Sequence, residues 1–434
     1  MIEPMSAKSR LLISAQPQRL SAPKAAVLVE IVTILTPGEA KLPNRRSGFA
    51  QNRETKLTEL LKELTREGTS LVELNFKKSL EARAPASIKA LTVDLDCYAR
   101  FCAQYGGIGL PADESRLVAY VDYCEGRRLK PATVSRRLSS LAVAHHLLGS
   151  PSPINASVVR DALRAFRRRA GIRQRQAGAL RFGEGIGREP VKGFTLSALL
   201  EACGRDVVAL RDAAILSLGY DAGLRVSELV AVELEQIEVQ EDGSGLLELA
   251  RSKTDQEGQG AWVWLSPDTM RRVALWREGA SIRSGVLFRR VAVTRTKASE
   301  ARRALAFGDL AYNARVDRER MVAQPARAAT VSYRIGESAL TPAAMRLIIK
   351  RTALAAADQG LVDLMGADLV EAVKGLSTHS LRVGLTQDLF ANGEDAGPIA
   401  QALRWTSTAT ALRYGRKLAP SSNAAARMLK GVRK

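Results

Sequence analysis

Apolar residues recur at helical spacing along most of the chain. Leu57, Leu60, Leu61 and Leu64 stand at i, i+3, i+4 and i+7, which predicts an amphipathic helix within residues 54–80. Four further helical patterns, separated by Gly and Pro breakers, cover residues 88–104, 114–127, 132–148 and 156–169. We therefore expect a compact all-helical unit over residues 86–170, preceded by a partly helical extension of unassigned role, residues 1–85.

The second half of the chain has a different pattern. Residues 171–193 are rich in Gly, Arg and Gln and poor in large apolar residues, which is typical of an exposed basic linker. Beyond them helical periodicity resumes, and residues 246–250 and 261–265 flank a polar turn that contains Gly, which predicts a β-hairpin. We expect residues 194–434 to form an α-rich domain with a small antiparallel sheet, interrupted by an insertion at about 289–334.

Length and charge add an expectation about partners. A chain of 434 residues suggests two or three domains. Its 65 Lys and Arg against 45 Asp and Glu leave a formal charge of +20, and residues 289–334 alone contain 11 Lys and Arg against 4 Asp and Glu. Such an excess favours a polyanionic partner, and the otherwise ordinary globular composition excludes wholesale disorder.

Several protein classes are disfavoured. The apolar run of residues 25–35 is about half as long as a membrane span, and no small-residue cleavage site follows it as in a secretory signal. The four cysteines form no C-x-x-C pair, which argues against a disulfide scaffold and a zinc ribbon. We expect a protein of a reducing, cytoplasmic compartment, with no membrane partner.

Arg225 and Glu228 form the first candidate for anion chemistry. Arg225 follows a break at Gly223 and opens a predicted helix, where backbone N–H groups also favour an anion. Glu228 lies one turn further on the same face and can hold the guanidinium in orientation. Taken alone, a pair at this spacing is more often a surface ion pair.

His379 and Arg382 repeat the i, i+3 spacing and form the second candidate. Gly384 follows them, and its lack of a side chain allows another segment to approach closely. The two other histidines, His145 and His146, are adjacent on the mostly apolar face of a helix, so we interpret them as structural.

Trp405 and Tyr414 complete the pattern near the C-terminus. An indole offers one N–H donor, and a phenol offers an oxygen nucleophile if a neighbour takes its proton. A phosphodiester can be cut without a metal by a hydroxyl nucleophile, if cations surround the non-bridging oxygens and an acid protonates the leaving oxygen. Arg suits the first task because its planar fork binds phosphate bidentately.

Taken together, these residues resemble a known catalytic set. In order and spacing they resemble the catalytic residues of the tyrosine recombinase (phage integrase) family. The resemblance extends over about residues 86–430, and it rests on Arg225, Lys253, His379, Arg382, Trp405 and Tyr414. Trp405, where most members have a second His, makes the Cre branch the nearest comparison. The resemblance implies the DNA breaking-rejoining fold, mainly α, with residues 86–170 as the helical core-binding (SAM-like) domain and residues 194–434 as the catalytic domain.

The resemblance also implies a reaction. Tyr414 would attack the scissile phosphate and give a 3′-phosphotyrosyl bond and a free 5′ hydroxyl. Lys253, in the turn of the predicted hairpin, would protonate the leaving 5′ oxygen, although Arg251 stands nearby. His379 would help to move the Tyr414 proton. Because the phosphotyrosyl bond conserves the phosphodiester energy, rejoining needs no metal, ATP or other cofactor.

The remaining members of the set would hold the phosphate. Arg225 and Arg382 would clamp it, Trp405 would donate its N–H and pack the site, and Glu228 would brace the pocket. One residue departs from the family pattern, since Arg404 stands where members commonly have a small residue. The insertion has no counterpart in compact members.

Six basic residues are candidate DNA contacts. A helix fits the major groove and Arg reads guanine edges, so the groove candidates are Lys130, Arg136 and Arg137. Contacts along the phosphate backbone are expected from Arg164, Arg167 and Arg168. A solvated face, or contacts to phosphate alone, explains the groove candidates equally well.

These implications predict a site-specific recombinase that integrates, excises or resolves DNA. Its partners would be double-stranded DNA with an inverted-repeat site and three further copies of itself, in a tetramer on two sites. An accessory directionality protein is a further candidate partner. The origin would be bacterial, or a phage, plasmid or transposon. The apolar positions in residues 421–434 make that segment a candidate for exchange between protomers. The alternatives are a type IB topoisomerase, a telomere-resolving enzyme or a non-catalytic helical DNA-binding protein.

Overall fold

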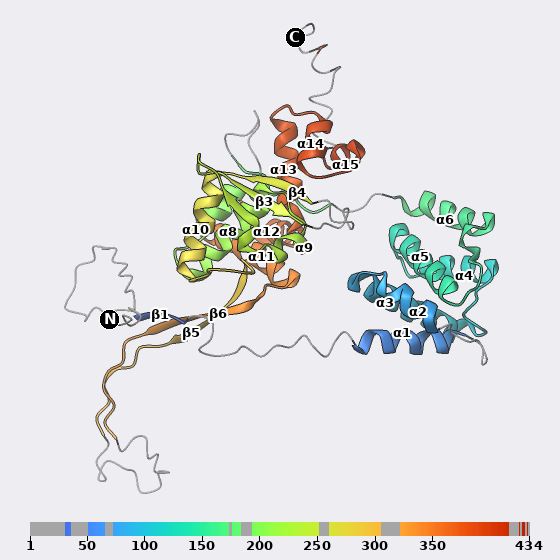
Figure 1. Ribbon diagram of the computed structural model, residues 1–434, viewed down its shortest axis with the longest axis horizontal. Helices are drawn as coiled ribbons and strands as arrows, with labels where there is room; N and C mark the ends of the chain where they lie inside the picture. The colour runs from blue at the N-terminus through green and yellow to red at the C-terminus, as the bar shows by residue number, and fades with distance from the viewer. Residues whose placement is uncertain are drawn as a thin grey trace, which may run out of the picture. The chain divides into compact units, whose positions relative to one another are not determined.

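The chain divides into two compact units. The computed structural model describes residues 31–35, 51–65, 73–172, 176–183, 193–250, 260–304 and 322–415, together with residues 425, 428, 429 and 432. One unit comprises Pro43–Gln176, and the other comprises Met1–Leu42 with Ala177–Lys434. Figure 1 shows the elements of each unit.

The first unit is entirely helical within its described residues. Its elements are α1 (Gln51–Leu64), α2 (Glu73–Glu81), α3 (Pro85–Tyr105), α4 (Glu114–Gly126), α5 (Pro131–Leu147), a short 3-10 turn (Pro153–Asn155) and α6 (Ser157–Ala170). Proline at the first helical position starts α3 and α5, where its missing N–H leaves no bond unmade. Asp113 caps α4 by accepting a 2.7 Å bond from the Arg116 backbone N–H.

The core of this unit extends further toward the N-terminus than the sequence predicts. Leu57, Leu61 and Leu64 of α1 are buried in one cluster with Leu95 and Tyr98 of α3, and α1 packs on α3. The predicted extension, residues 1–85, therefore shares its core with the predicted helical unit. Helical periodicity identified α1, but it could not show that α1 packs on α3.

The two adjacent histidines of α5 differ in environment. His145 is fully buried, and its Nε2 accepts a 3.0 Å bond from the Ala112 backbone N–H. Its Nδ1 lies 2.8 Å from the Leu141 carbonyl oxygen, so the ring joins α5 to the start of α4. His146 is exposed. The structural interpretation holds for His145.

The second unit contains nine described helices and two small sheets. Its helices are α7 (Leu196–Ala202), α8 (Val207–Asp221), α9 (Val226–Ala231), α10 (Pro267–Gly279), α11 (Pro342–Asp358), α12 (Gly366–Gly375), α13 (His379–Ala391), α14 (Ala396–Ala402) and α15 (Thr408–Tyr414). Its strands are β1 (Ile31–Leu35), β2 (Ile237–Val239), β3 (Gly245–Leu249), β4 (Ala261–Leu265), β5 (Arg289–Thr296) and β6 (Thr330–Ala339). The expected fold class, mainly α with a small antiparallel sheet, is confirmed.

The antiparallel sheet has the order β2-β3-β4. Leu247 of β3 pairs with Val263 of β4, and both are buried. This is the predicted hairpin, and β2 is an additional edge strand that the sequence analysis missed because it is only three residues long.

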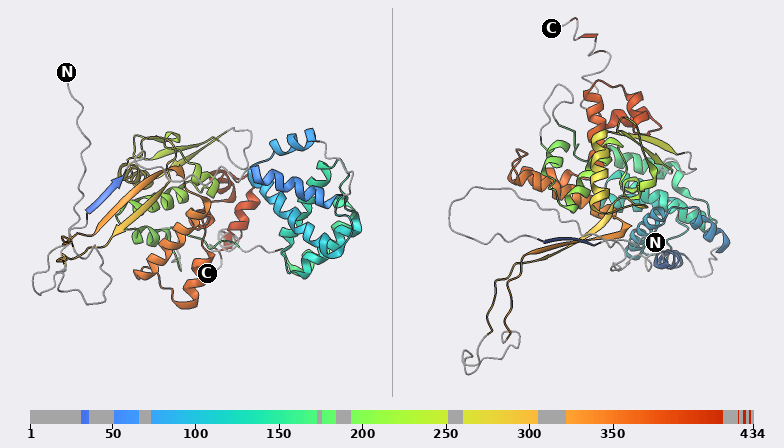
Figure 2. Two further views of the ribbon diagram at one scale, coloured as in Figure 1. Left: turned by 90° about the horizontal axis from the view of Figure 1, so that it is seen from below. Right: turned by 60° about the vertical axis from the view of Figure 1, so that its left-hand side comes forward.

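The predicted insertion contains a second sheet. Strands β5 and β6 are antiparallel, and β1 pairs with β6 in parallel at the other edge; Figure 2 shows the three strands side by side. The sequence analysis expected only weak periodicity here and missed both strands. In β5 no position is buried, so it lacks an apolar face. In β6 the first six positions alternate between partly exposed and buried, a pattern that the analysis did not recognise.

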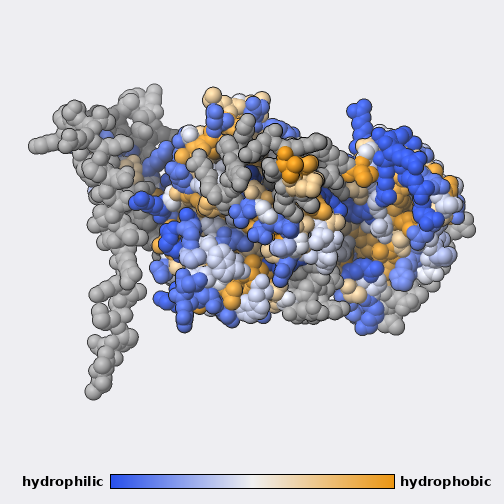
Figure 3. Space-filling view, turned by 90° about the horizontal axis from the view of Figure 1, so that it is seen from above, coloured by the Kyte–Doolittle hydropathy of each residue, from blue (hydrophilic) through white to orange (hydrophobic). Residues whose placement is uncertain are grey.

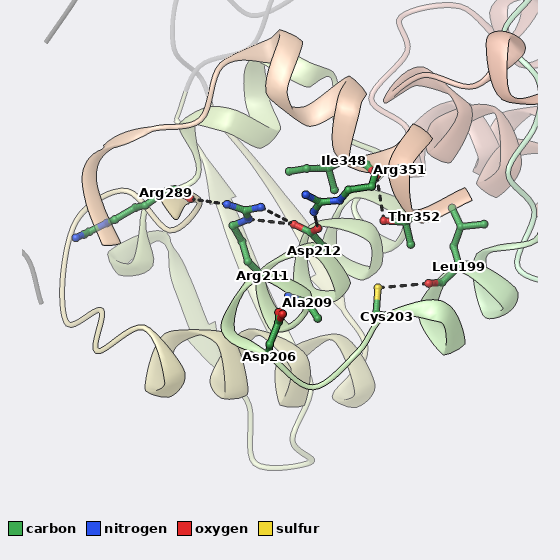
Figure 4. A network of polar contacts seen from close by, with 10 residues as sticks. All are labelled: Leu199, Cys203, Asp206, Ala209, Arg211, Asp212, Arg289, Ile348, Arg351 and Thr352. Atoms are coloured by element: carbon green, nitrogen blue, oxygen red, sulfur yellow. Dashed lines mark hydrogen bonds and ion pairs between the residues drawn. The ribbon is translucent and has the colours of Figure 1, made fainter. Parts of the chain in front are cut away.

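A buried ion-pair network fixes α8 in the second unit. The Arg211 guanidinium donates to Asp212 Oδ1 at 2.8 and 3.0 Å and to the Arg289 carbonyl oxygen at 3.3 Å, and Arg351 of α11 donates to Asp212 Oδ2. Figure 4 shows both arginines pointing at this carboxylate. The network joins α8 to β5 and α11.

Part of the predicted linker, residues 171–193, packs into the second unit. Leu180 is fully buried, its N–H donates to the Ser380 carbonyl oxygen at 2.9 Å, and the Arg181 Nε donates to Asp388 Oδ1 at 2.5 Å. Residues 177–183, here called the strap, therefore lie along α13, which corrects the expectation of an exposed linker for this part. Low apolar content concealed it, because a single buried leucine carries the packing.

The surface of the described residues is largely polar. Hydrophilic residues cover most of the coloured area on the face drawn in Figure 3, and apolar residues appear there in scattered patches. Across the described ranges, we find no helix that is both long and apolar enough to cross a bilayer.

Candidate active site

Arg225 and Glu228 are held by the turn between α8 and α9. Gly223 has a φ of 51°, a left-handed conformation that glycine adopts without steric penalty, and it redirects the chain into α9. The buried Glu228 carboxylate accepts two bonds from Arg225, one from its backbone N–H at 2.9 Å and one from Nη1 at 2.8 Å. The predicted pair is therefore not on the surface, and the carboxylate fixes the guanidinium.

Arg382 lies on α13 and is 1% exposed. Its guanidinium donates to the Gly223 carbonyl oxygen at 2.5 Å and to the Leu403 carbonyl oxygen. Burial, followed by the positive charges of Arg225 and Arg404, lowers the pKa of Arg382 to about 10. The side chain therefore stays charged at neutral pH, in a pocket that favours an added anion.

His379 begins α13 and contacts Tyr414 at the end of α15. Its Nε2 lies 2.8 Å from the Tyr414 hydroxyl oxygen, and the two ring centroids are 5.4 Å apart. Burial, and then the charges of Arg382 and Arg225, lower the pKa of His379 below its usual 6.5. A neutral imidazole at this position can accept the phenol proton.

Trp405 covers the other side of the tyrosine. Its ring stacks on Tyr414 at a centroid distance of 5.2 Å and an interplanar angle of 7°. The guanidinium carbon of Arg382 lies 5.0 Å from the Trp405 ring centroid, within the range of a cation–π contact. Residues as far as 414 − 225 = 189 positions apart in sequence, Arg225 and Tyr414, thus meet around Arg382. The order of the motifs along the chain could not show this.

Comparison with known proteins identifies the family. The model of the "Phage integrase family" matches residues 191–419, which is more than half of the chain. The chain belongs to the phage integrase family. It is therefore a tyrosine recombinase, as the sequence analysis expects.

Two curated members are similar to this integrase. The integrase/recombinase XerD homolog of Selenomonas ruminantium is 29% identical over 241 residues, which cover 53% of this chain and 67% of that protein. The recombinase Cre of Escherichia phage P1 is 25% identical over 338 residues, covering 76% of this chain and 84% of Cre. Among solved structures, the XerH site-specific recombinase bound to a palindromic difH substrate matches with a TM-score of 0.48 and 13% identity, over 88% of this chain and 98% of that chain.

Lys253 lies outside the described residues, as does the neighbouring Arg251. Strands β3 and β4, which flank Lys253 in the sequence, lie within one residue of the predicted positions. Its assignment as the general acid stays a prediction.

Five of the six candidate DNA contacts are exposed. Lys130 precedes α5, and Arg136 forms a 2.6 Å ion pair with the buried Asp94 while keeping 48% of its side chain exposed. Arg137 differs, because its side chain is only 14% exposed and its Nη2 donates to Cys97 Sγ at 3.2 Å. In this state of the integrase Arg137 packs within the helical unit and does not present its guanidinium for reading bases.

The backbone candidates lie on α6. Arg164 pairs with Asp161 at 2.6 Å, Arg167 donates to the Ser135 hydroxyl at 3.0 Å, and Arg168 is exposed. A row of exposed arginines on one helix suits phosphate contacts.

Arg404 is the residue of the site that the sequence analysis did not assign. Its Nη2 donates to Glu228 Oε2 at 3.1 Å, so one carboxylate serves two guanidiniums. The sequence indicated Arg404 only as a departure from the family pattern, in which a small residue commonly precedes the position of Trp405.

Proposed function

We propose that this chain is a site-specific DNA recombinase that cuts and rejoins double-stranded DNA through Tyr414. The observation that carries the proposal is the 2.8 Å contact between His379 Nε2 and the Tyr414 hydroxyl beside the buried Arg382. A nucleophile in contact with a base, next to fixed cations, is the arrangement that phosphodiester cleavage requires. Membership in the phage integrase family supports the same reaction.

In the proposed cleavage step, the Tyr414 oxygen attacks the scissile phosphorus while its proton passes to His379. The bond from phosphorus to the 5′ oxygen breaks, and Lys253 protonates the leaving oxygen. Arg225 and Arg382 bind the non-bridging oxygens, and their charge stabilises the pentacoordinate transition state. Attack of a 5′ hydroxyl on the phosphotyrosine reverses the step and joins the strands.

The two units have different proposed roles. The first unit binds DNA through its exposed basic residues, which neutralise phosphates and make affinity fall steeply with salt. The second unit carries the chemistry. A clamp of two basic units on a duplex accounts for the net charge of +20.

The proposed assembly is a tetramer on two inverted-repeat sites. Its support is the apolar C-terminal stretch, where Met428, Leu429 and Val432 are helical and 65%, 40% and 78% exposed. Exchange of this segment between protomers would bury them. Deletion of residues 421–434 is expected to spare DNA binding and abolish synapsis, as measured by gel shift and by strand exchange.

A covalent trap tests the proposed function. Nicked duplexes from the chain's own genomic neighbourhood, mixed with the protein in EDTA and denatured, should yield protein–DNA adducts with wild type and none with Tyr414→Phe. Adducts formed equally by both proteins would exclude the tyrosine nucleophile. Tight binding without any adduct would favour a non-catalytic DNA-binding protein.

Strand exchange separates the catalytic alternatives. A recombinase joins strands from two matched duplexes, whereas a type IB topoisomerase relaxes supercoils without exchanging partners, and a telomere-resolving enzyme closes hairpin ends. Products that join two differently labelled duplexes are expected here. Relaxed circles or hairpins as the sole products would contradict the assignment.

A further inference from the structure

Arg404 occupies a backbone position that favours glycine. It follows α14 with a φ of 55°, its N–H donates to the Gln401 carbonyl oxygen at 3.0 Å, and the Trp405 N–H donates to the Ala400 carbonyl oxygen at 2.8 Å. This is the Schellman pattern of a helix end, in which the left-handed residue is usually Gly. A residue with a side chain is less stable there by about 1 kcal/mol, so Arg404 carries a penalty that a glycine would avoid.

The guanidinium of Arg404 is buried and incompletely paired. The side chain is 12% exposed, and Nη2 donates to Glu228 Oε2 at 3.1 Å. Among the described residues, its Nε and Nη1 have no hydrogen-bond partner although both atoms are buried. Burial lowers the pKa of Arg404, Glu228 opposes that shift, and Arg225 adds to it. Buried donors without partners are unfavourable, so a second penalty falls on the same residue.

The charges around this position do not balance in the free protein. Arg225, Arg382 and Arg404 contribute three positive charges and Glu228 one negative charge, so the group carries 3 − 1 = +2 while His379 is neutral. A phosphodiester supplies one negative charge, and the pentacoordinate phosphorane of the transition state supplies two. Among the described residues, the pocket therefore holds two positive charges in excess when Arg404 is counted, and one when it is not.

We propose that Arg404 is a third guanidinium of the scissile-phosphate pocket, and that its Nε and Nη1 donate to a non-bridging oxygen as negative charge develops there. This rests on the proposed function, and it adds Arg404 to the catalytic residues already assigned. Arg404 transfers no proton and forms no covalent bond in the step. Its interaction with a doubly charged phosphorane would offset the cost of an arginine at a left-handed position with two buried donors unpaired.

Single-turnover cleavage of two matched nicked duplexes tests the assignment. One duplex has an ordinary phosphodiester at the scissile position, and the other has a methylphosphonate, which lacks one negative charge. Arg404→Gly should slow formation of the Tyr414 adduct at least 100-fold on the phosphodiester, the effect typical of a lost transition-state donor, and less than threefold on the methylphosphonate. Arg404→Lys should fall between wild type and Arg404→Gly on the phosphodiester.

The control is Ser281→Gly. Ser281 is exposed and has a φ of 53°, so this variant also relieves a left-handed position but leaves the pocket intact. It should cleave both duplexes at the wild-type rate. Arg404→Gly itself should melt at a higher temperature than wild type, because it removes backbone strain and two buried donors without partners.

Two outcomes would overturn the proposal. Equal slowing on both duplexes would mean that Arg404 acts by positioning Glu228, and unchanged cleavage would mean that it does not act on the phosphate. If wild type forms no Tyr414-dependent adduct, the proposed function fails separately. In that case, the melting temperatures of wild type and Arg404→Gly are compared in inorganic phosphate and in chloride at equal ionic strength. If phosphate stabilises both proteins by the same amount, an anion contact at Arg404 is excluded.

Discussion

Gly384 marks the closest approach between α13 and the strap. A Cβ built on Gly384 would overlap the carbonyl carbon and oxygen of Leu180 and lie 2.9 Å from the Arg181 backbone nitrogen. These are backbone atoms, which cannot rotate away as a side chain can. Gly384→Ala must therefore push the strap off the helix that carries His379 and Arg382.

The loss can be worked out from the contacts of the strap. Displacement breaks the 2.9 Å bond from the Leu180 N–H to the Ser380 carbonyl oxygen and two bonds to the buried Asp388 carboxylate, from Arg181 Nε at 2.5 Å and the Phe182 N–H at 2.7 Å. At about 1 kcal/mol for the first and about 1.5 kcal/mol for each bond to a charged group, the free energy of unfolding falls by about 4 kcal/mol. For a domain of this size the melting temperature falls by roughly 8–16 °C.

Tryptophan fluorescence is a selective assay for this change. The four tryptophans, Trp262, Trp264, Trp276 and Trp405, all lie in the second unit, so their emission reports the unfolding of that unit in the intact chain. The matched control is Gly178→Ala in the same strap, where a Cβ meets the nearest atom at 3.7 Å, an ordinary contact. A Gly384→Ala variant that melts within about 2 °C of this control would refute the reasoning.

Three further predictions concern charge and stacking. Burial and then the neighbouring arginines lower the pKa of His379 below 6.5, so its neutral form predominates at neutral pH. Cleavage at subsaturating DNA should therefore fall on acidification with a midpoint below pH 6.5, and a midpoint above pH 6.5 would contradict the role as base. Trp405→Ala removes the stacking on Tyr414 and should slow single-turnover cleavage about tenfold, whereas Trp405→Phe should keep most of the rate; equal rates in both variants would count against the stacking. Asp212→Asn weakens the ion-pair network around the buried Asp212 carboxylate and should lower the free energy of unfolding of the second unit by about 3 kcal/mol. Urea titrations followed by tryptophan fluorescence measure this loss. The control Asp268→Asn, at a partly exposed ion pair, should change the free energy of unfolding by under about 1 kcal/mol.

Local patterns in the sequence determined most of the helices and the hairpin, and they supplied the candidate site residues. Helical periodicity located α3 to α6 to within a few residues, since apolar spacing reflects the face that each helix buries. The family could be predicted from the order of Arg225, His379, Arg382, Trp405 and Tyr414, and the comparison confirmed it. This was possible because few residue types can bind a phosphate or attack it. A glycine after Arg382 also indicated close approach of another segment, and the strap provides it.

Only the tertiary structure decided which segments meet. The packing of α1 on α3, the strap along α13 and the pairing of β1 with β6 join residues far apart in the chain, and local periodicity contains no information about such contacts. The same holds for Arg137, whose guanidinium turns toward Cys97, and for Arg404, whose role depends on sharing Glu228 with Arg225. The sequence specified which groups are charged, and the fold determined which of them are buried without enough partners, because desolvation and pairing depend on distances between elements that only folding sets.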